Sequence, residues 1–232
     1  MKALTSILVM LTIAGCSTDE LQPEMALEET QVYKKAGFRN TDTKDPHANV
    51  GLTYQNMLNA YYMLPGNASG LAQVIDRAES VAFLNPDFVR LNNDFAYVPI
   101  SPDDVIPYLG DGALNELLSE EYSLHATGLL TEIAAQLDLL KAQNLPFQDV
   151  EAYFKIVDAG IINDTTLEVE ERDALLTTTS IVCNALDNDR KRKRRDRDWE
   201  WMTTHLAATA NAALESVPQA IMMSFITDVY QQ

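Results

Sequence analysis

Few residues of this chain have the type and spacing that a chemical site needs. The three histidines, His47, His125 and His205, have no ligand-type residue four positions later, so spacings such as H-E-x-x-H are absent. Glycine patterns of the G-x-S-x-G, P-loop and dinucleotide-binding kinds are absent as well. The sequence therefore predicts no metal centre and no cofactor, and it leaves the histidines to pack or to face water.

Acidic residues occur in three adjacent pairs, which are Asp103-Asp104, Glu120-Glu121 and Glu170-Glu171. Neighbouring residues on a helix point in different directions, so these pairs do not form catalytic dyads. Acidic residues in the first turn of a helix interact favourably with the helix dipole, so their presence there needs no catalytic explanation. A two-carboxylate hydrolase would instead need acids from distant segments, for instance Asp94–Asp111, to converge in a cleft with raised pKa values.

The two thiols, Cys16 and Cys183, have different surroundings. Cys183 lies in an amphipathic helical pattern, which predicts a buried small hydrophobic residue. Cys16 follows a short positive start, Met1-Lys2, and an almost wholly apolar run from Ala3 to Ile13. That run is too short to span a membrane, which takes about 20 residues, but it suits the core of an export signal.

The apolar run ends in Ile13-Ala14-Gly15-Cys16, which resembles the lipobox of bacterial lipoproteins. The resemblance implies that residues 1–15 are removed and that Cys16 becomes a diacylated N-terminus; the alternative is an ordinary secretory signal. Residues 16–45 are polar and acidic, which predicts a flexible tether with a reach of roughly 30 Å. Ser17-Thr18-Asp19-Glu20 resembles the acidic surface-export signal of Bacteroidetes lipoproteins, which favours the outer membrane.

Charge is distributed very unevenly along the chain. The net charge is −17, with 34 acidic and 17 basic residues. Seven of the basic residues lie in one short run, which we interpret either as a solvated helix end or as a contact for an anionic surface, such as lipid phosphates or an acidic protein: Arg190, Lys191, Arg192, Lys193, Arg194, Arg195 and Arg197. The remaining surface is strongly acidic and repels phosphates, so nucleic acid is excluded as a partner.

Helical periodicity dominates residues 46–232, which we expect to form a single all-α domain, an irregular bundle of about six to eight helices. Asp45-Pro46 predicts the start of the first helix, and Asn85-Pro86 predicts the end of the second. Residues 95–98 are expected to form an isolated strand or a packed loop, and 113–143 a single helix. A capping box of Thr165 and Glu168 is expected to start a long helix, and Pro218 to break the last one. Residues 206–226 are expected to be buried rather than inserted in a membrane.

Three segments together resemble uncharacterised Bacteroidetes lipoproteins: the lipobox, the motif from Asp45 to Gly51, and the helix from Leu175 to Ile181 that precedes a Trp-containing stretch and an alanine-rich end. The resemblance implies a lipid-anchored helical protein and assigns no catalytic residue. We therefore expect a non-enzymatic module that binds an envelope protein or a glycan. The alternatives are a hydrolase of envelope polymers using scattered carboxylates and a small immunity-type lipoprotein.

Overall fold

The structure is a computed structural model that describes residues 47–94, 97–110, 114–143, 146–191 and 199–231. These residues fall within one compact unit, Asp42–Gln232. Every regular element in them is a helix, so the all-α prediction is confirmed. The expected signal peptide, tether and lipidation site Cys16 lie outside the described residues.

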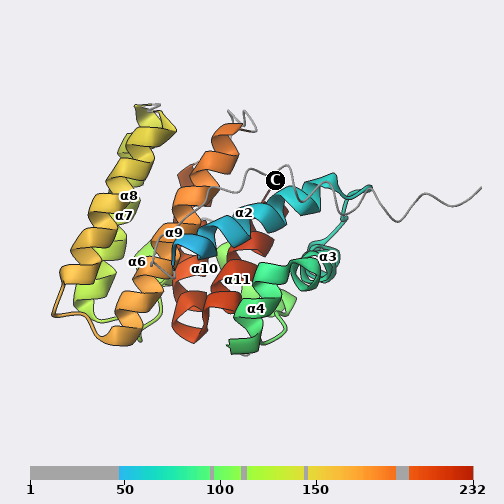
Figure 1. Ribbon diagram of the computed structural model, residues 1–232, viewed down its shortest axis with the longest axis horizontal. Helices are drawn as coiled ribbons and strands as arrows, with labels where there is room; N and C mark the ends of the chain where they lie inside the picture. Colours follow the sequence, from blue (N-terminus) through green and yellow to red (C-terminus); the bar gives the residue numbers. More distant parts are fainter. Residues whose placement is uncertain (1–46, 95–96, 111–113, 144–145, 192–198, 232) are drawn as a thin grey trace, which may run out of the picture. The chain divides into compact units, whose positions relative to one another are not determined.

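The described ranges contain eight helices of at least nine residues. They are α2 (Ala48–Met63), α3 (Leu71–Leu84), α4 (Pro86–Asp94), α7 (Leu124–Ala142), α8 (Phe147–Asn163), α9 (Val169–Lys191), α10 (Trp199–Glu215) and α11 (Val217–Tyr230). The shorter elements are α5 (Pro102–Val105), the 3-10 helix η1 (Ile106–Tyr108) and α6 (Leu114–Leu117). Figure 1 shows α8 beside α9, and α10 and α11 behind α2.

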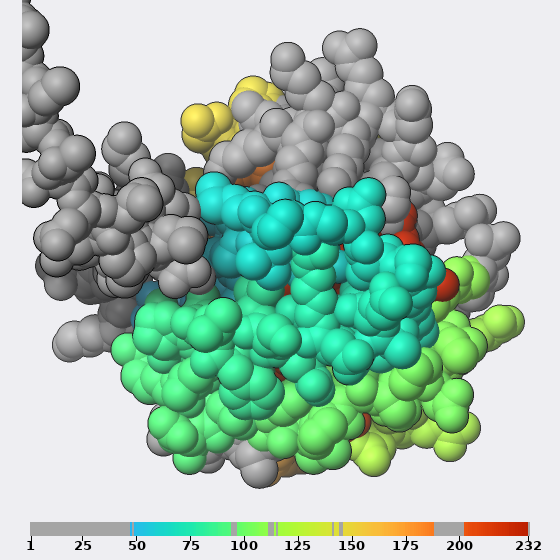
Figure 2. All heavy atoms as spheres, turned by 90° about the vertical axis from the view of Figure 1, so that its right-hand side faces the viewer, coloured from blue at the N-terminus to red at the C-terminus, as the bar shows by residue number. Residues whose placement is uncertain are grey.

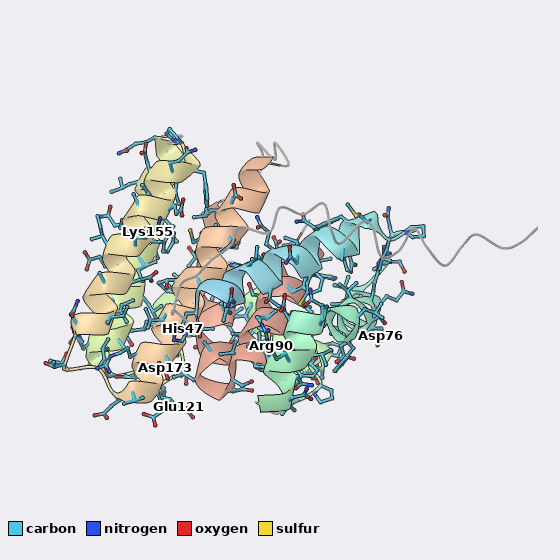
Figure 3. The ribbon with its side chains drawn as sticks, in the orientation of Figure 1. His47, Asp76, Arg90, Glu121, Lys155 and Asp173 are labelled. Carbon is cyan, nitrogen blue, oxygen red and sulfur yellow. The ribbon has the colours of Figure 1, made fainter. Side chains whose placement is uncertain are left out.

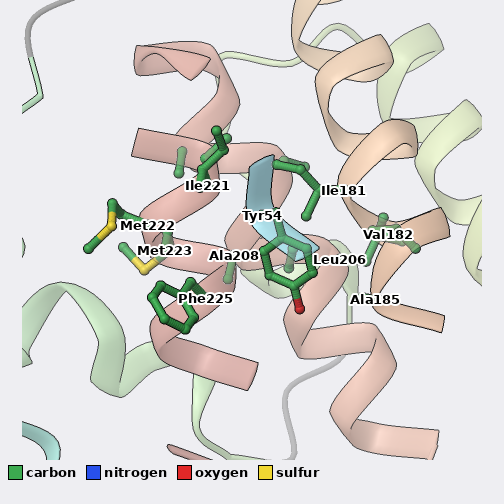
Figure 4. Packing of buried hydrophobic residues seen from close by; sticks show 14 of the residues in the cluster. Tyr54, Ile181, Val182, Ala185, Leu206, Ala208, Ile221, Met222, Met223 and Phe225 are labelled. Carbon is green, nitrogen blue, oxygen red and sulfur yellow. The ribbon is translucent and has the colours of Figure 1, made fainter. Parts of the chain in front are cut away.

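Helix α11 forms the centre of the core. All residues from Pro218 to Val229 are buried, although a helix at a surface would expose one side. The alanines of α10 allow the neighbouring helix to approach closely, and Figure 4 shows Ala208 and Leu206 beside Ile221 and Phe225. In Figure 2, α3 and α4 cover most of the C-terminal segment on that face. Most of residues 206–226 are buried as expected, but residues 211, 213, 214, 216 and 217 are only half-buried and Glu215 is exposed. No described helix is long and apolar enough to cross a membrane.

The prediction of one helix over 113–143 is wrong, because a turn separates α6 from α7. Backbone donors of this turn are bound by side chains from other elements: Asn211 Oδ1 accepts the N–H of Ser119 (2.8 Å), and Glu171 Oε1 accepts that of Ser123 (2.6 Å). The Ser123 hydroxyl then accepts the N–H of Ala126 in the first turn of α7. No Gly or Pro marks this break, and Ser123 is the local residue that indicates a helix start there.

The predicted capping box at Thr165 and Glu168 is also wrong. Helix α9 begins only at Val169, since Asp164 Oδ1 accepts the N–H (2.8 Å) and hydroxyl (2.6 Å) of Thr166 and holds the preceding residues in a turn. Glu171 supplies the cap instead, and its Oε2 accepts the N–H of Glu168.

The other expected starts and breaks agree better with the structure. Residues 97–101 contain no regular element, so of the two predictions for this segment the loop agrees with the structure and the strand does not. Phe95 and Ala96 lie outside the described residues. Asn85 ends α3 as predicted, and its Oδ1 caps the unpredicted helix α4 by accepting the N–H groups of Asp87 and Phe88. Pro218 lies in the first turn of α11, so the predicted break before it is confirmed.

Helices α2 and α9 cross in close contact at Gly51. The Gly51 N–H donates to Ser180 Oγ (3.0 Å), and that hydroxyl donates to the His47 carbonyl (2.7 Å). A Cβ atom on Gly51 would lie 2.2 Å from the backbone oxygen of Ser180 and from Asn184 Nδ2. Only glycine allows this approach, because the α9 backbone cannot move aside as a flexible side chain could.

We expect Gly51→Ala to lower the free energy of unfolding by roughly 1–3 kcal/mol, because the added methyl group must push two helices apart. Urea unfolding followed by circular dichroism measures this. Gly160→Ala is the matched control: it lies on α8, where a Cβ would meet nothing within 4 Å, and it should leave stability unchanged or slightly raised. Equal stability of the two variants would contradict the close crossing.

Candidate functional site

A buried polar cluster lies at the junction of α2, α10 and α11. The Tyr54 hydroxyl donates to Asp228 Oδ2 (3.0 Å), and His205 Nε2 lies 2.7 Å from Ser224 Oγ. The rings of Tyr54 and His205 meet edge to face, with centroids 6.2 Å apart. Ser224 and Asp228 are four residues apart on α11, so they project from the same side of that helix. The cluster therefore joins three helices through side chains that are distant in sequence.

A serine paired with a histidine is the arrangement that activates a hydroxyl nucleophile. Here the pair has no route to a substrate: Ser224 and His205 are 0% exposed, and Asp228 is 3% exposed. Catalysis requires the nucleophile to reach the reacting atom, which these positions do not allow. The cluster instead pairs the Tyr54 hydroxyl with Asp228 and the Ser224 hydroxyl with His205 Nε2 inside an apolar core, where such groups are costly to leave unpaired.

A second pair, His125 and Asp164, lies at the surface where the start of α7 meets the end of α8. His125 Nε2 donates to Asp164 Oδ2 at 2.6 Å. Together with the two bonds from Thr166, this contact holds the pKa of the Asp164 carboxyl well below its usual range. Nearby, burial would raise the pKa of Glu171, but hydrogen bonds from Ser123 and Glu168 outweigh it and lower that pKa. The pair ties two helix ends together.

Several other charged side chains among the described residues lie far from one another. Figure 3 shows Asp76, Arg90, Glu121 and Lys155 on separate parts of the fold, while His47 at the start of α2 lies 3.7 Å from Asp173. In the described ranges no three His, Cys, Asp or Glu side chains are grouped so that they could hold a metal ion.

Cys183 is half-buried on α9. Burial raises the pKa of its thiol to about 12, and the carboxylates of Glu151, Asp158 and Asp187 raise it further. A nucleophilic cysteine requires the opposite, a lowered pKa and a cationic environment. The sequence predicted a buried small hydrophobic residue; the structure places Cys183 half-buried, with a raised thiol pKa.

The acids of the adjacent pairs do not act together. Asp104, for example, has a structural role at the start of α5. Asp104 Oδ2 accepts the N–H and the hydroxyl of Ser101 in a capping box at the start of α5. Glu215, at the end of α10, has a pKa raised first by burial and then by the charges of Asp104 and Glu121. This is the one place among the described residues where an acid from Asp94–Asp111 lies near a carboxyl group with a raised pKa.

Both site predictions from the sequence lie beyond what the structure describes. Cys16 belongs to the N-terminal range that precedes residue 47, and residues 192–197 of the basic run are outside the described ranges. Arg190 and Lys191 continue the backbone of α9, with side chains outside the description. The predicted contact with an anionic surface therefore stays a prediction.

Sequence reasoning missed both the buried cluster and the surface pair. His125 and Asp164 are 39 residues apart, and Tyr54 and Asp228 are 174 apart, so no short motif could contain them. One signal was available: Ser224 and Asp228 share one face of an otherwise apolar helix, and such a face must find polar partners.

Comparisons with known proteins give no relative for this chain: no family model matches it, and neither do the curated proteins or the solved structures.

We expect acid to remove the stabilising contribution of Asp164. Its pKa is lower in the folded state than in the unfolded chain, where an aspartate titrates near pH ~4. The carboxylate thus stabilises the fold above that pH, and the contribution is lost as the pH falls through the folded pKa. The difference in unfolding free energy between wild type and Asp164→Asn should shrink as the pH falls below about 4.

Urea unfolding at a series of pH values measures this difference. Working below about pH 5.5 limits the contribution of histidine titration to the unfolding free energy, because histidines ordinarily titrate near 6.5. Asp103→Asn, at an exposed position on α5, controls for the general loss of a negative charge. A difference for Asp164→Asn that is independent of pH would contradict the argument.

Proposed function

We propose that this chain is a lipid-anchored lipoprotein of a bacterial cell envelope, whose helical domain binds another envelope component and is not an enzyme. The observation that carries the proposal is the position of Cys16 directly after a short apolar run and two small residues. The acidic sequence after Cys16 supports an outer-membrane location. An envelope protein or a glycan is the proposed partner.

The chemistry of the anchor supports stable attachment. Each methylene buried in a membrane contributes about 0.8 kcal/mol, and a single myristoyl-sized chain binds only marginally. A diacylated cysteine supplies two or three chains, so release from the membrane would be negligible. The basic run from Arg190 to Arg197 is proposed as an additional contact for anionic headgroups or for an acidic protein.

The non-enzymatic part of the proposal rests on what the described side chains do. The one Ser–His pair is enclosed in the core, and the Cys183 thiol has a raised pKa. Many large apolar side chains are instead exposed, among them Leu84 at 73%, Leu124 at 94% and Ile156 at 73%. Such side chains offer apolar surface that a binding partner would cover.

One observation favours the alternative of an envelope-polymer hydrolase: the raised pKa of Glu215 near Asp104 and Glu121. A general acid needs such a raised pKa. Against this reading, Asp104 already accepts two hydrogen bonds at a helix start, and Glu215 is exposed. Hydrolysis of purified peptidoglycan by wild type that is lost in Glu215→Gln would establish the enzyme and overturn the binding module. The immunity-type alternative has no structural feature in its favour beyond the acidic charge.

Replacement of Cys16 tests the anchor. Cys16→Ala lacks the thiol that takes up the lipid, so labelled palmitate should enter the wild type and not the variant. The variant should also keep residues 1–15, because the lipoprotein peptidase requires a lipidated cysteine. Labelling in growing cells, membrane fractionation and intact-mass measurement check these outcomes. Cys183→Ala is the matched control and should label as the wild type does.

Two results would contradict the proposal in different ways. Release of Cys16→Ala as soluble protein cut after another small residue would indicate an ordinary secretory signal. Uptake of label by Cys16→Ala would mean that another residue carries the lipid.

A further inference from the structure

Two carboxylates from the junction of α8 and α9 bind the start of α7. Glu171 Oε1 accepts the N–H of Ser123 (2.6 Å), and Asp164 Oδ2 accepts a hydrogen bond from His125 Nε2 (2.6 Å). Apolar packing contributes little at this helix end, because Ser123, Leu124 and His125 are all exposed to solvent. The attachment of these three residues therefore depends on polar contacts, and the strength of such contacts depends on charge.

Both carboxylates stay ionised throughout the pH range in which histidine titrates. Hydrogen bonds from His125 and Thr166 hold the pKa of the Asp164 carboxyl well below its usual range. Burial would raise the pKa of Glu171, but the hydrogen bonds that it accepts outweigh burial and lower that pKa. The positive charge of a protonated His125 also lowers the pKa of both acids, so this ring interacts with both of them.

The other titratable groups at this junction keep the same charge in that range. The Arg172 guanidinium is always cationic, and it donates to two backbone carbonyls of the turn before α9 (2.8 and 3.2 Å). The Tyr122 hydroxyl stays neutral, because burial raises its pKa and the neighbouring carboxylate raises it further. Carboxylates on the two adjoining turns, Glu121 and Glu168, belong to a residue type that ordinarily titrates near pH ~4. His125 is therefore the group here whose charge changes near pH ~6.5.

Gain or loss of a proton at His125 changes the strength of its contact with Asp164. A protonated ring carries a positive charge that both carboxylates attract, and the hydrogen bond then joins two ions. A neutral ring loses this attraction, and it can donate to Asp164 only in the tautomer that has its proton on Nε2. While Asp164 stays ionised, the contribution of the contact is thus present below the histidine range and is lost as the pH rises through it.

We propose that His125 is a pH-sensitive latch: its protonated ring holds the start of α7 to the junction of α8 and α9, and loss of the proton lets this helix end open more often. This inference goes beyond the proposed function and does not depend on the lipid anchor.

Amide hydrogen exchange, measured by NMR on the full chain carrying Cys16→Ser in a mild detergent, tests the latch. The reporters are the N–H of Ser123, which donates to Glu171, and the N–H of Thr127, which donates to the Ser123 carbonyl (2.9 Å). Their protection factors, which are corrected for the intrinsic pH dependence of exchange, would be compared at about pH 5.5 and about pH 8, on either side of the histidine range. Protection should be about two- to fivefold higher at the lower pH, the range expected for a surface ion pair.

Two variants of the latch separate charge from shape. His125→Gln is neutral at both pH values, so its protection should stay at the level that the wild type shows at the higher pH. His125→Arg is cationic at both, so its protection should stay at the higher level. Both substitutions are at an exposed position, where most changes leave the fold intact. A pH dependence that persists unchanged in His125→Gln would overturn the proposal, and so would wild-type protection that is independent of pH.

Two controls show whether the effect is local. His47→Gln removes another histidine, which lies 3.7 Å from Asp173 at the start of α2. Asp173 follows Glu171 by two residues and so points to a different side of α9. This variant should therefore keep the wild-type pH dependence at Ser123 and Thr127. The amides of α11, a helix buried all round, report global unfolding in the same spectra. A change of protection in α11 as large as that at the start of α7 would overturn a local latch.

Discussion

The fold depends on the burial of α11 from every side. A helix whose residues are buried all round must be enclosed by other elements, and here α2, α3, α4, α9 and α10 all pack against it. This explains why the chain forms a bundle around its own C-terminal segment, which the N-terminal helices cover (Figure 2). It also means that α11 completes the core of helices that precede it in the chain.

Complete burial brings a second constraint, since α11 carries Gln219, Ser224, Thr227 and Asp228 among its apolar residues. Each buried polar group needs a partner, because leaving it unpaired costs about 1–3 kcal/mol. Thr227 bonds back to the carbonyl of Met223 in its own helix (2.8 Å), while Ser224 and Asp228 reach α10 and α2. Hydrogen bonds have direction, unlike apolar contacts, so these pairs fix the rotation of α11 relative to its neighbours. The close crossing at Gly51 fixes the position of α2 on α9 in a similar way.

The sequence predicted those features of the fold that neighbouring residues along the chain determine. Helical periodicity predicted the all-α bundle, and asparagine and proline predicted the breaks at Asn85 and before Pro218. It failed where a distant side chain decides the backbone, as Glu171 and Asn211 do at the turn that separates α6 from α7. The Ser224–His205 pair could not be foreseen for the same reason. Sequence reasoning also missed a local turn, in which Asp164 binds Thr166 and delays the start of α9. Of the candidate sites, Cys16 could be predicted from the sequence, because an export signal is a short continuous segment.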